Sequence, residues 1–163
     1  MLVKGKQRWE EYVTGLSSVR IAGTDFVLTP GQGGILPEEL HGLYIVTSDN
    51  PGGIARDPIV NRERRNDMRV DLVSLLISGG ITKMYQSRGS RDASFANPEV
   101  GFAVDMDEAH ALIFGHAFGQ DCVYHLVPEG RRLLSCALIQ DSRDSRPQSM
   151  ICSRYPTARD SAF

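Results

Sequence analysis

The sequence predicts an α+β domain with a ferredoxin-like βαββαβ core and an N-terminal elaboration made of a helix and a hairpin. Between about residues 41 and 138, the apolar patterns follow the order strand, helix, strand, strand, helix, strand. At 163 residues, 41% of them hydrophobic, the chain has the size and composition of one globular domain. We expect an elaboration packed on the core over residues 1–40, the core over 41–138, and a loose polar tail over 139–163.

The first 40 residues are expected to form a short helix followed by a hairpin. Gln7–Leu16 carries apolar residues at helical spacing. Val19–Ile21 and Phe26–Leu28 flank a short loop that contains Gly23, which is the pattern of a hairpin. The glycine-rich segment at 30–34 lacks the lysine of a phosphate-binding loop, so we interpret it as a connector.

A strand at Leu43–Thr47 and a long helix open the predicted core. The strand is rich in β-branched and aromatic residues, and the turn at Asn50-Pro51 ends it. Asp57 followed by a proline is a favourable helix start, and Gly79 is a favourable helix end. The apolar stripe of this helix is Met68, Leu72, Leu75 and Leu76.

The rest of the core is expected to contain one more helix and four strands. The helix begins after Asp105 or Asp107 and ends at Gly119, and a polar loop at 87–98 precedes it in the chain. The strands are expected at 81–86, 100–104, 122–127 and 132–137.

Several polar side chains are expected to meet at one edge of this sheet. In a ferredoxin-like topology, that edge receives the turn after the first strand, the loop between the second and third strands, and the junction after the second helix. The start of the first helix lies there too, and binding sites commonly lie on loops over a rigid scaffold. We therefore predict a ligand-binding site formed by Asn50, Arg62, Asn66, Glu99 and Gln120.

Most of these side chains also have a structural interpretation. Asn50 beside a proline is what a turn requires, and the arginines around Arg62 form a stripe typical of a solvated helix face. Asn66 is expected to make a tertiary hydrogen bond, either to the Asn50 loop or to a ligand. Glu99 is expected to pair with Arg62 or Arg65, which would keep its pKa low and make it a poor base near neutral pH. Gln120 fits a helix cap and a ligand contact equally well.

Composition limits the classes of partner. The formal net charge of −2 argues against broad capture of nucleic acid, and no apolar run approaches the roughly 18 residues of a membrane span. The first residues lack the apolar region of a secretory signal. The three cysteines fit neither a disulfide framework nor a metal knuckle. We expect a cytoplasmic protein with no cofactor or metal, and a small molecule or another protein as its partner.

The order of short motifs resembles a bacterial family of short uncharacterised proteins, which is catalogued as a domain of unknown function. The resemblance covers about residues 44–124 and implies no particular chemistry. One departure is that the family tends to have two asparagines four residues apart near the helix start, whereas Asn61 and Asn66 are five apart. The motifs are Thr47-x-x-Asn50-Pro51-Gly52, the Asn- and Arg-rich helix with Leu72 and Gly80, Gly89, Glu99-x-x-Phe102, Ala109, and Phe118-Gly119-Gln120-x-x-Val123.

These observations leave the function open among three classes. The first is a binding module for an anionic or nucleotide-like small ligand at the predicted edge, because arginine offers a planar fork for phosphate or carboxylate. The second is a hydrolase or transferase acting on a nucleotide-like metabolite, with Glu99 or His116 transferring protons. The third is a module that binds protein or RNA. No motif assigns a catalytic residue.

Overall fold

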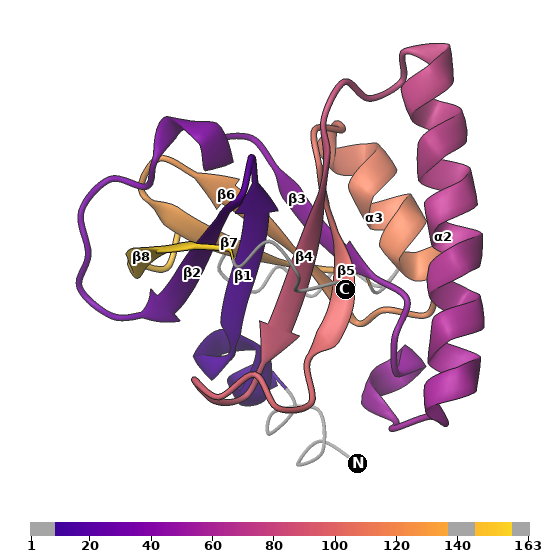
Figure 1. Ribbon diagram of the computed structural model, residues 1–163, viewed down its shortest axis with the longest axis horizontal. Helices are drawn as coiled ribbons and strands as arrows, with labels where there is room; N and C mark the ends of the chain where they lie inside the picture. The colour runs from indigo at the N-terminus through magenta and orange to yellow at the C-terminus, as the bar shows by residue number, and fades with distance from the viewer. Residues whose placement is uncertain (1–8, 137–145, 158–163) are drawn as a thin grey trace.

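An antiparallel sheet of eight strands dominates the computed structural model, which describes residues 9–136 and 146–157 (Figure 1). The order of the strands across the sheet is β7-β6-β3-β5-β4-β1-β2-β8. The strands are β1 (Leu16–Ile21), β2 (Thr24–Pro30), β3 (Tyr44–Thr47), β4 (Met84–Ser90), β5 (Glu99–Val104), β6 (Cys122–Val127), β7 (Gly130–Ser135) and β8 (Met150–Pro156).

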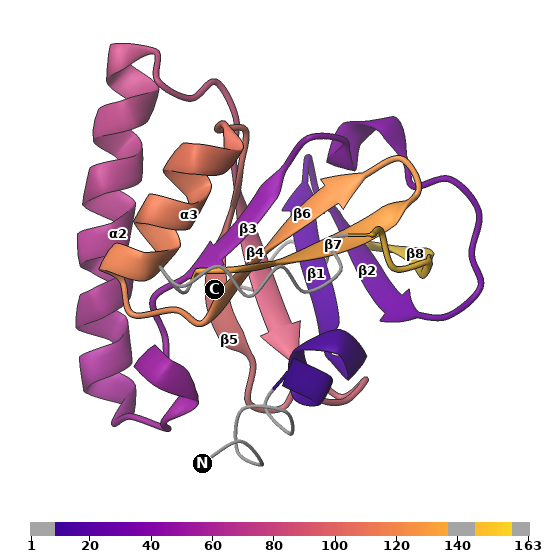
Figure 2. The same ribbon diagram turned by 180° about the vertical axis from the view of Figure 1, so that it is seen from behind.

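The prediction of an α+β ferredoxin-like core is wrong, because the sheet continues well beyond the strands expected for it. β4 pairs with β1, through residues 86–90 and 16–20, and β2 and β8 extend the sheet further. The whole sheet curls into a half-barrel (Figures 1 and 2). The N-terminal hairpin is therefore part of the sheet, and the division into an elaboration and a core does not describe the molecule.

Two segments predicted to lack regular structure are strands. Ser87–Ser90, assigned to a polar loop, completes β4 and pairs with β1. The predicted strand at 81–86 begins later, at Met84, because the Asp105 carboxylate accepts hydrogen bonds from the backbone N–H groups of Thr82 and Lys83. Residues 150–156, expected to belong to a loose tail, form β8 and pair with β2 along its length. The remaining tail at 139–145 and 158–163 lies outside the described residues.

Two helices lie side by side over one face of the sheet (Figures 1 and 2). They are α2 (Pro58–Ser78) and α3 (Glu108–Ala117). Their predicted ends are confirmed: Asp57 and Asp107 accept hydrogen bonds from backbone N–H groups in the first turns, and Gly79 ends α2 with a φ of 81°. Short helical turns occupy residues 9–14, Glu38–Leu40 (η1) and Pro51–Gly53 (η2). In the described ranges, no helix combines the length and apolarity needed to cross a membrane.

Each face of the sheet carries its own hydrophobic core because side chains alternate along a strand. On β3 and β5, Val46 and Phe102 pack against the helices together with Met68 and Leu72 of α2. Their neighbours Ile45 and Ala103 point into the concave face. There they join apolar side chains of β1, β2, β6 and β8: Val19, Phe26, Leu28, Leu126 and Met150.

In the described part of the chain, the two edges of the curled sheet meet at one isolated bridge. Arg131 on β7 pairs with Gln148, just before β8, through two backbone hydrogen bonds of 2.9 Å. Gly130 permits this approach, because a Cβ atom there would lie 1.9 Å from the Gln148 carbonyl oxygen. The bridge turns an open sheet into a partly closed one.

The side chain of Arg131 secures this closure from inside. It is 1% exposed, and its guanidinium lies 4.2 Å from the centre of the Tyr124 ring. Nη1 donates to the Ser17 hydroxyl at 2.7 Å, and Nη2 donates to the Gln148 side-chain oxygen at 3.2 Å. Nη2 also donates to the backbone carbonyls of residues 12 and 13. One buried cation thus joins β7, β6, β1, the N-terminal helical turn and the segment before β8.

We expect Arg131→Met to lower the free energy of unfolding by on the order of 3 kcal/mol, because it leaves buried hydrogen-bond acceptors without a donor. The matched control is Arg132→Met on the same strand. Arg132 bridges to the half-exposed Glu108, so its loss should reduce stability by at most about 1 kcal/mol. Urea denaturation measures both values. Equal losses in the two variants would contradict the role assigned to Arg131.

Candidate functional site

The turn that follows β3 is held in an unusual backbone conformation. Asn50 is left-handed, with a φ of 48°, and η2 follows it directly. The Gly52 N–H donates to the Gly119 carbonyl at 2.7 Å, which docks the turn on the junction between α3 and β6. A Cβ atom on Gly119 would lie 2.9 Å from the Pro51 Cβ, so a glycine is needed for this close approach.

Asn50 is the centre of a hydrogen-bond network. Its backbone N–H donates to Asn61 Oδ1 at 3.0 Å, and Asn61 Nδ2 donates back to Asn50 Oδ1 at 2.9 Å. The same Oδ1 accepts from the backbone N–H of Arg56 at 3.0 Å. The Asn50 Nδ2 donates to Glu99 Oε1 at 3.0 Å. These bonds fix the turn against both α2 and the start of β5.

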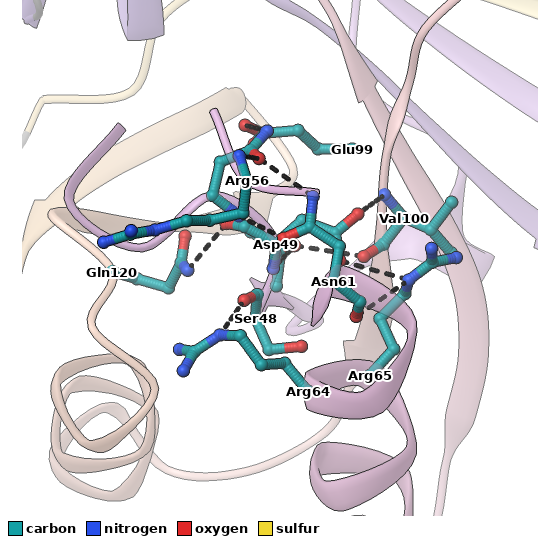
Figure 3. A network of polar contacts seen from close by, with 11 residues as sticks. Ser48, Asp49, Arg56, Asn61, Arg64, Arg65, Glu99, Val100 and Gln120 are labelled. Carbon is teal, nitrogen blue, oxygen red and sulfur yellow. Dashed lines mark hydrogen bonds and ion pairs between the residues drawn. The ribbon is translucent and has the colours of Figure 1, made fainter. Parts of the chain in front are cut away.

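Asp49 anchors the turn from the other side (Figure 3). It is 3% exposed; its Oδ2 accepts from the Val100 N–H at 3.1 Å, and its Oδ1 lies 3.1 Å from Arg65 Nε. Burial raises the pKa of this carboxyl, while the Val100 N–H and Arg65 act in the opposite direction. Gln120 Nε2 donates to the Asp49 carbonyl at 3.1 Å. The Asp49 carboxylate therefore has a charged partner inside the protein.

Three of the five predicted site residues come together and two do not. Asn50 and Glu99 are hydrogen-bonded, and Gln120 contacts the same turn. Arg62 and Asn66 are exposed on α2 and take no part in this network. The helix residues that contact the turn are instead Asn61, which forms hydrogen bonds with Asn50, and Arg65, which pairs with Asp49.

The helical pattern contained a signal that identifies these missed residues. Asn61 and Arg65 precede Met68 and Leu72 at spacings that place all four on one face of a helix. Extending the apolar stripe toward the start of α2 would therefore have selected them over Arg62. Arg64 was missed as well; its Nε donates to the Ser48 carbonyl at 2.7 Å and its Nη2 donates to the Phe118 carbonyl.

A cavity of about 480 Å³ opens on the concave face beside this network. Its walls come from β1, β3, β4, β5 and β6, and its rim from the N-terminal helical turn and the loop before β5. Glu99 and Gln120 line it together with Ile45 and the Tyr124 ring. Gly89 on β4 leaves it open, since a Cβ atom there would meet nothing closer than the Leu16 carbonyl at 3.9 Å.

The Glu99 carboxyl lies half-buried in the wall of this cavity. Burial raises its pKa, and the nearby charge of Asp49 raises it further, while the Asn50 hydrogen bond lowers it. The expected ion pair with Arg62 or Arg65, and the low pKa that would follow, are not found, because Arg65 pairs with Asp49. Asp49 thus has an arginine in contact, whereas among the described residues the hydrogen-bond donor to Glu99 is the neutral Asn50 amide.

Two other groups that line the cavity, the Cys122 thiol and the Tyr124 hydroxyl, are neutral at ordinary pH. Burial raises the pKa of the Cys122 thiol and of the Tyr124 hydroxyl, which donates to the Tyr12 carbonyl at 2.8 Å. His116 is exposed on α3 and does not line the cavity. In the described ranges, no group of three His, Cys, Asp or Glu side chains could hold a metal ion.

We expect Asn61→Ala to reduce the free energy of unfolding by about 2 kcal/mol, because it removes two hydrogen bonds and leaves the Asn50 N–H without an acceptor. Asn66→Ala on the same helix is the matched control, and its exposed side chain should make a difference of no more than about 0.5 kcal/mol. Chemical denaturation of the two variants measures the difference. A larger loss in the free energy of unfolding for Asn66→Ala than for Asn61→Ala would contradict the role assigned to Asn61.

Glu99→Gln is expected to leave stability at pH 7 unchanged or higher. The folded-state pKa of Glu99 is raised, so the folded protein binds more protons than the unfolded chain between the two pKa values, and stability falls as pH rises through that interval. Glutamine keeps an acceptor for Asn50 and removes the charge. The difference in the free energy of unfolding between Glu99→Gln and wild type should therefore shrink as the pH is lowered below about 4.3, the pKa of a glutamate in the unfolded chain.

Urea denaturation at several pH values measures this effect. Glu63→Gln, at an exposed position of α2, is the control and should follow the wild-type profile. A Glu99→Gln variant that is less stable than wild type at pH 7 would show that the carboxylate is compensated by a contact other than Asn50.

The chain was compared with protein-family models, curated proteins and solved structures, and none of the three comparisons finds a match. The resemblance to a bacterial family of uncharacterised proteins therefore stays a prediction.

Proposed function

We propose that the protein is a small-molecule binding module and that its site is the cavity on the concave face of the sheet. The observation that carries this proposal is a half-buried carboxyl, Glu99, in the wall of a cavity of about 480 Å³. That volume falls within the roughly 300–1,000 Å³ of typical small-molecule sites. Mixed walls, with an apolar floor and a few oriented polar groups, are also typical of such sites.

The charges of the cavity favour a neutral or positively charged ligand over the anionic ligand expected from the sequence. Its lining includes three carboxyl side chains, from Glu11, Asp92 and Glu99, and one guanidinium, from Arg91. Arg64 donates a hydrogen bond to the Ser48 carbonyl, and Arg65 forms an ion pair with Asp49. Two arginines of this helix are therefore used within the fold, and the exposed Arg62 does not line the cavity.

Proton-transfer catalysis, as in a hydrolase or transferase, is the second candidate function. A raised pKa in a cavity wall is the property that suits a carboxyl to act as a general acid or base. If Glu99 has this role, mass spectrometry will detect chemical change in a ligand incubated with the wild type. The Glu99→Gln variant would then leave that ligand unchanged.

We also propose a cytoplasmic location. Cys122, Cys136 and Cys152 are all free thiols, which supports a reducing compartment.

Gly89→Val is expected to abolish ligand binding without unfolding the protein. Its side chain would enter the cavity from a strand position where β-branched residues are favourable, and its Cβ has room. The matched control is Gly34→Val, at an exposed loop position where a Cβ would meet nothing within 4 Å.

A thermal-shift screen of neutral and cationic metabolites on the three proteins tests this proposal. Compounds that stabilise wild type and Gly34→Val, but not Gly89→Val, would support the cavity as the site. Equal stabilisation of all three proteins would place binding elsewhere and overturn the proposal.

A further inference from the structure

We propose that the ligand of the cavity is an organic cation, a protonated amine or an amidinium or guanidinium group, that forms an ion pair with Glu99. This inference rests on the proposed function and adds the charge and the chemical class of the ligand. It comes from a comparison of the two carboxyl groups that flank the Asn50 turn.

Asp49 and Glu99 lie close together and are compensated very differently. Asp49 has Arg65 Nε at 3.1 Å and the Val100 N–H at 3.1 Å. Glu99 receives one neutral hydrogen bond, from the Asn50 amide to Oε1. Its second oxygen, Oε2, accepts no hydrogen bond from the part of the chain that the structure describes. A carboxylate partly removed from water is stabilised chiefly by a nearby cation, and among the described residues Glu99 has none in contact.

Two arginines near the cavity, Arg91 and Arg131, have other partners. Arg91 is the arginine whose charge acts most on Glu99, but its side chain is 81% exposed and pairs with Glu11 at 3.2 Å. Arg131 lies behind the Tyr124 ring, where it donates to the Ser17 hydroxyl and to carbonyl oxygens. Asp121, which directly precedes β6, accepts a hydrogen bond from the Tyr12 hydroxyl at 2.7 Å. A cation in the cavity therefore meets an available carboxylate at Glu99.

The remaining walls suit the uncharged part of such a ligand. Leu16, Ile45 and the Tyr124 ring offer apolar surface next to the carboxyl. A compact organic cation can thus bury its hydrocarbon part against β1, β3 and β6 while its N–H groups reach Glu99. Binding would replace water around a charged group with an ion pair, which is effective where the surroundings exclude solvent.

Matched pairs of small probes test the inference, because each pair keeps its shape and changes its charge. Benzamidine is compared with benzamide, and n-butylamine with n-butanol, by NMR titration of the wild-type protein at pH 7. We expect at least one cation to bind at least tenfold more tightly than its neutral partner, with shifts at residues lining the cavity. Glu99→Gln should remove that preference, and the control Glu63→Gln should keep it.

The outcomes separate this inference from the proposed function. If neutral probes bind as tightly as cations and Gly89→Val abolishes the binding of both, the inferred preference for a cation is wrong. The cavity would still be the binding site. Cation binding that survives Glu99→Gln would overturn the ion pair. Failure of every cationic probe to bind would overturn the inference, while the wider metabolite screen continues to test the cavity itself.

Discussion

The closure of the sheet by a buried arginine is the interaction on which the rest of the structure depends. Arg131 and its bridge to Gln148 bring the two sheet edges together. The same guanidinium holds β1 and the N-terminal helical turn through Ser17 and the carbonyls of residues 12 and 13. Those segments supply one wall and part of the rim of the cavity. A sheet without this curl would present a flat surface in place of a site.

The second constraint is the turn after β3, which sets the electrostatics of the cavity. Asn50, in its left-handed conformation, directs its amide at Glu99 while its backbone N–H is held by Asn61. The Arg65 guanidinium forms an ion pair with the Asp49 carboxylate. Glu99 is left with an amide partner in a partly buried position, and its pKa is raised by that burial. Besides this hydrogen bond, the carboxyl has no cation in contact among the described residues, as the proposal of a ligand contact at Glu99 requires.

The site could be predicted in part from the sequence, and the missing part has a definite cause. Asn50, Glu99 and Gln120 follow or precede strands whose ends are visible in the sequence, so their meeting followed from the order of elements. Arg62 and Asn66 do not reach the turn because their angular positions place them on the exposed side of α2, which the composition of the helix start does not reveal. Asn61 and Arg65 share the face of Met68 and Leu72, and only that face reaches the turn.

By itself, the sequence determined the local features: the caps of α2 and α3, the turn at Asn50-Pro51, and the approximate places of most strands. These depend on side chains that bond to backbone groups a few residues away. Only the tertiary structure decided the fold class, because β4 joins β1, and β2 joins β8, through hydrogen bonds between distant segments. A polar segment such as Ser87–Ser90 becomes a strand when a neighbour satisfies its backbone, and no local pattern in the sequence encodes that neighbour. The cavity arises from the same long-range pairing, since its walls belong to strands that are far apart in the sequence.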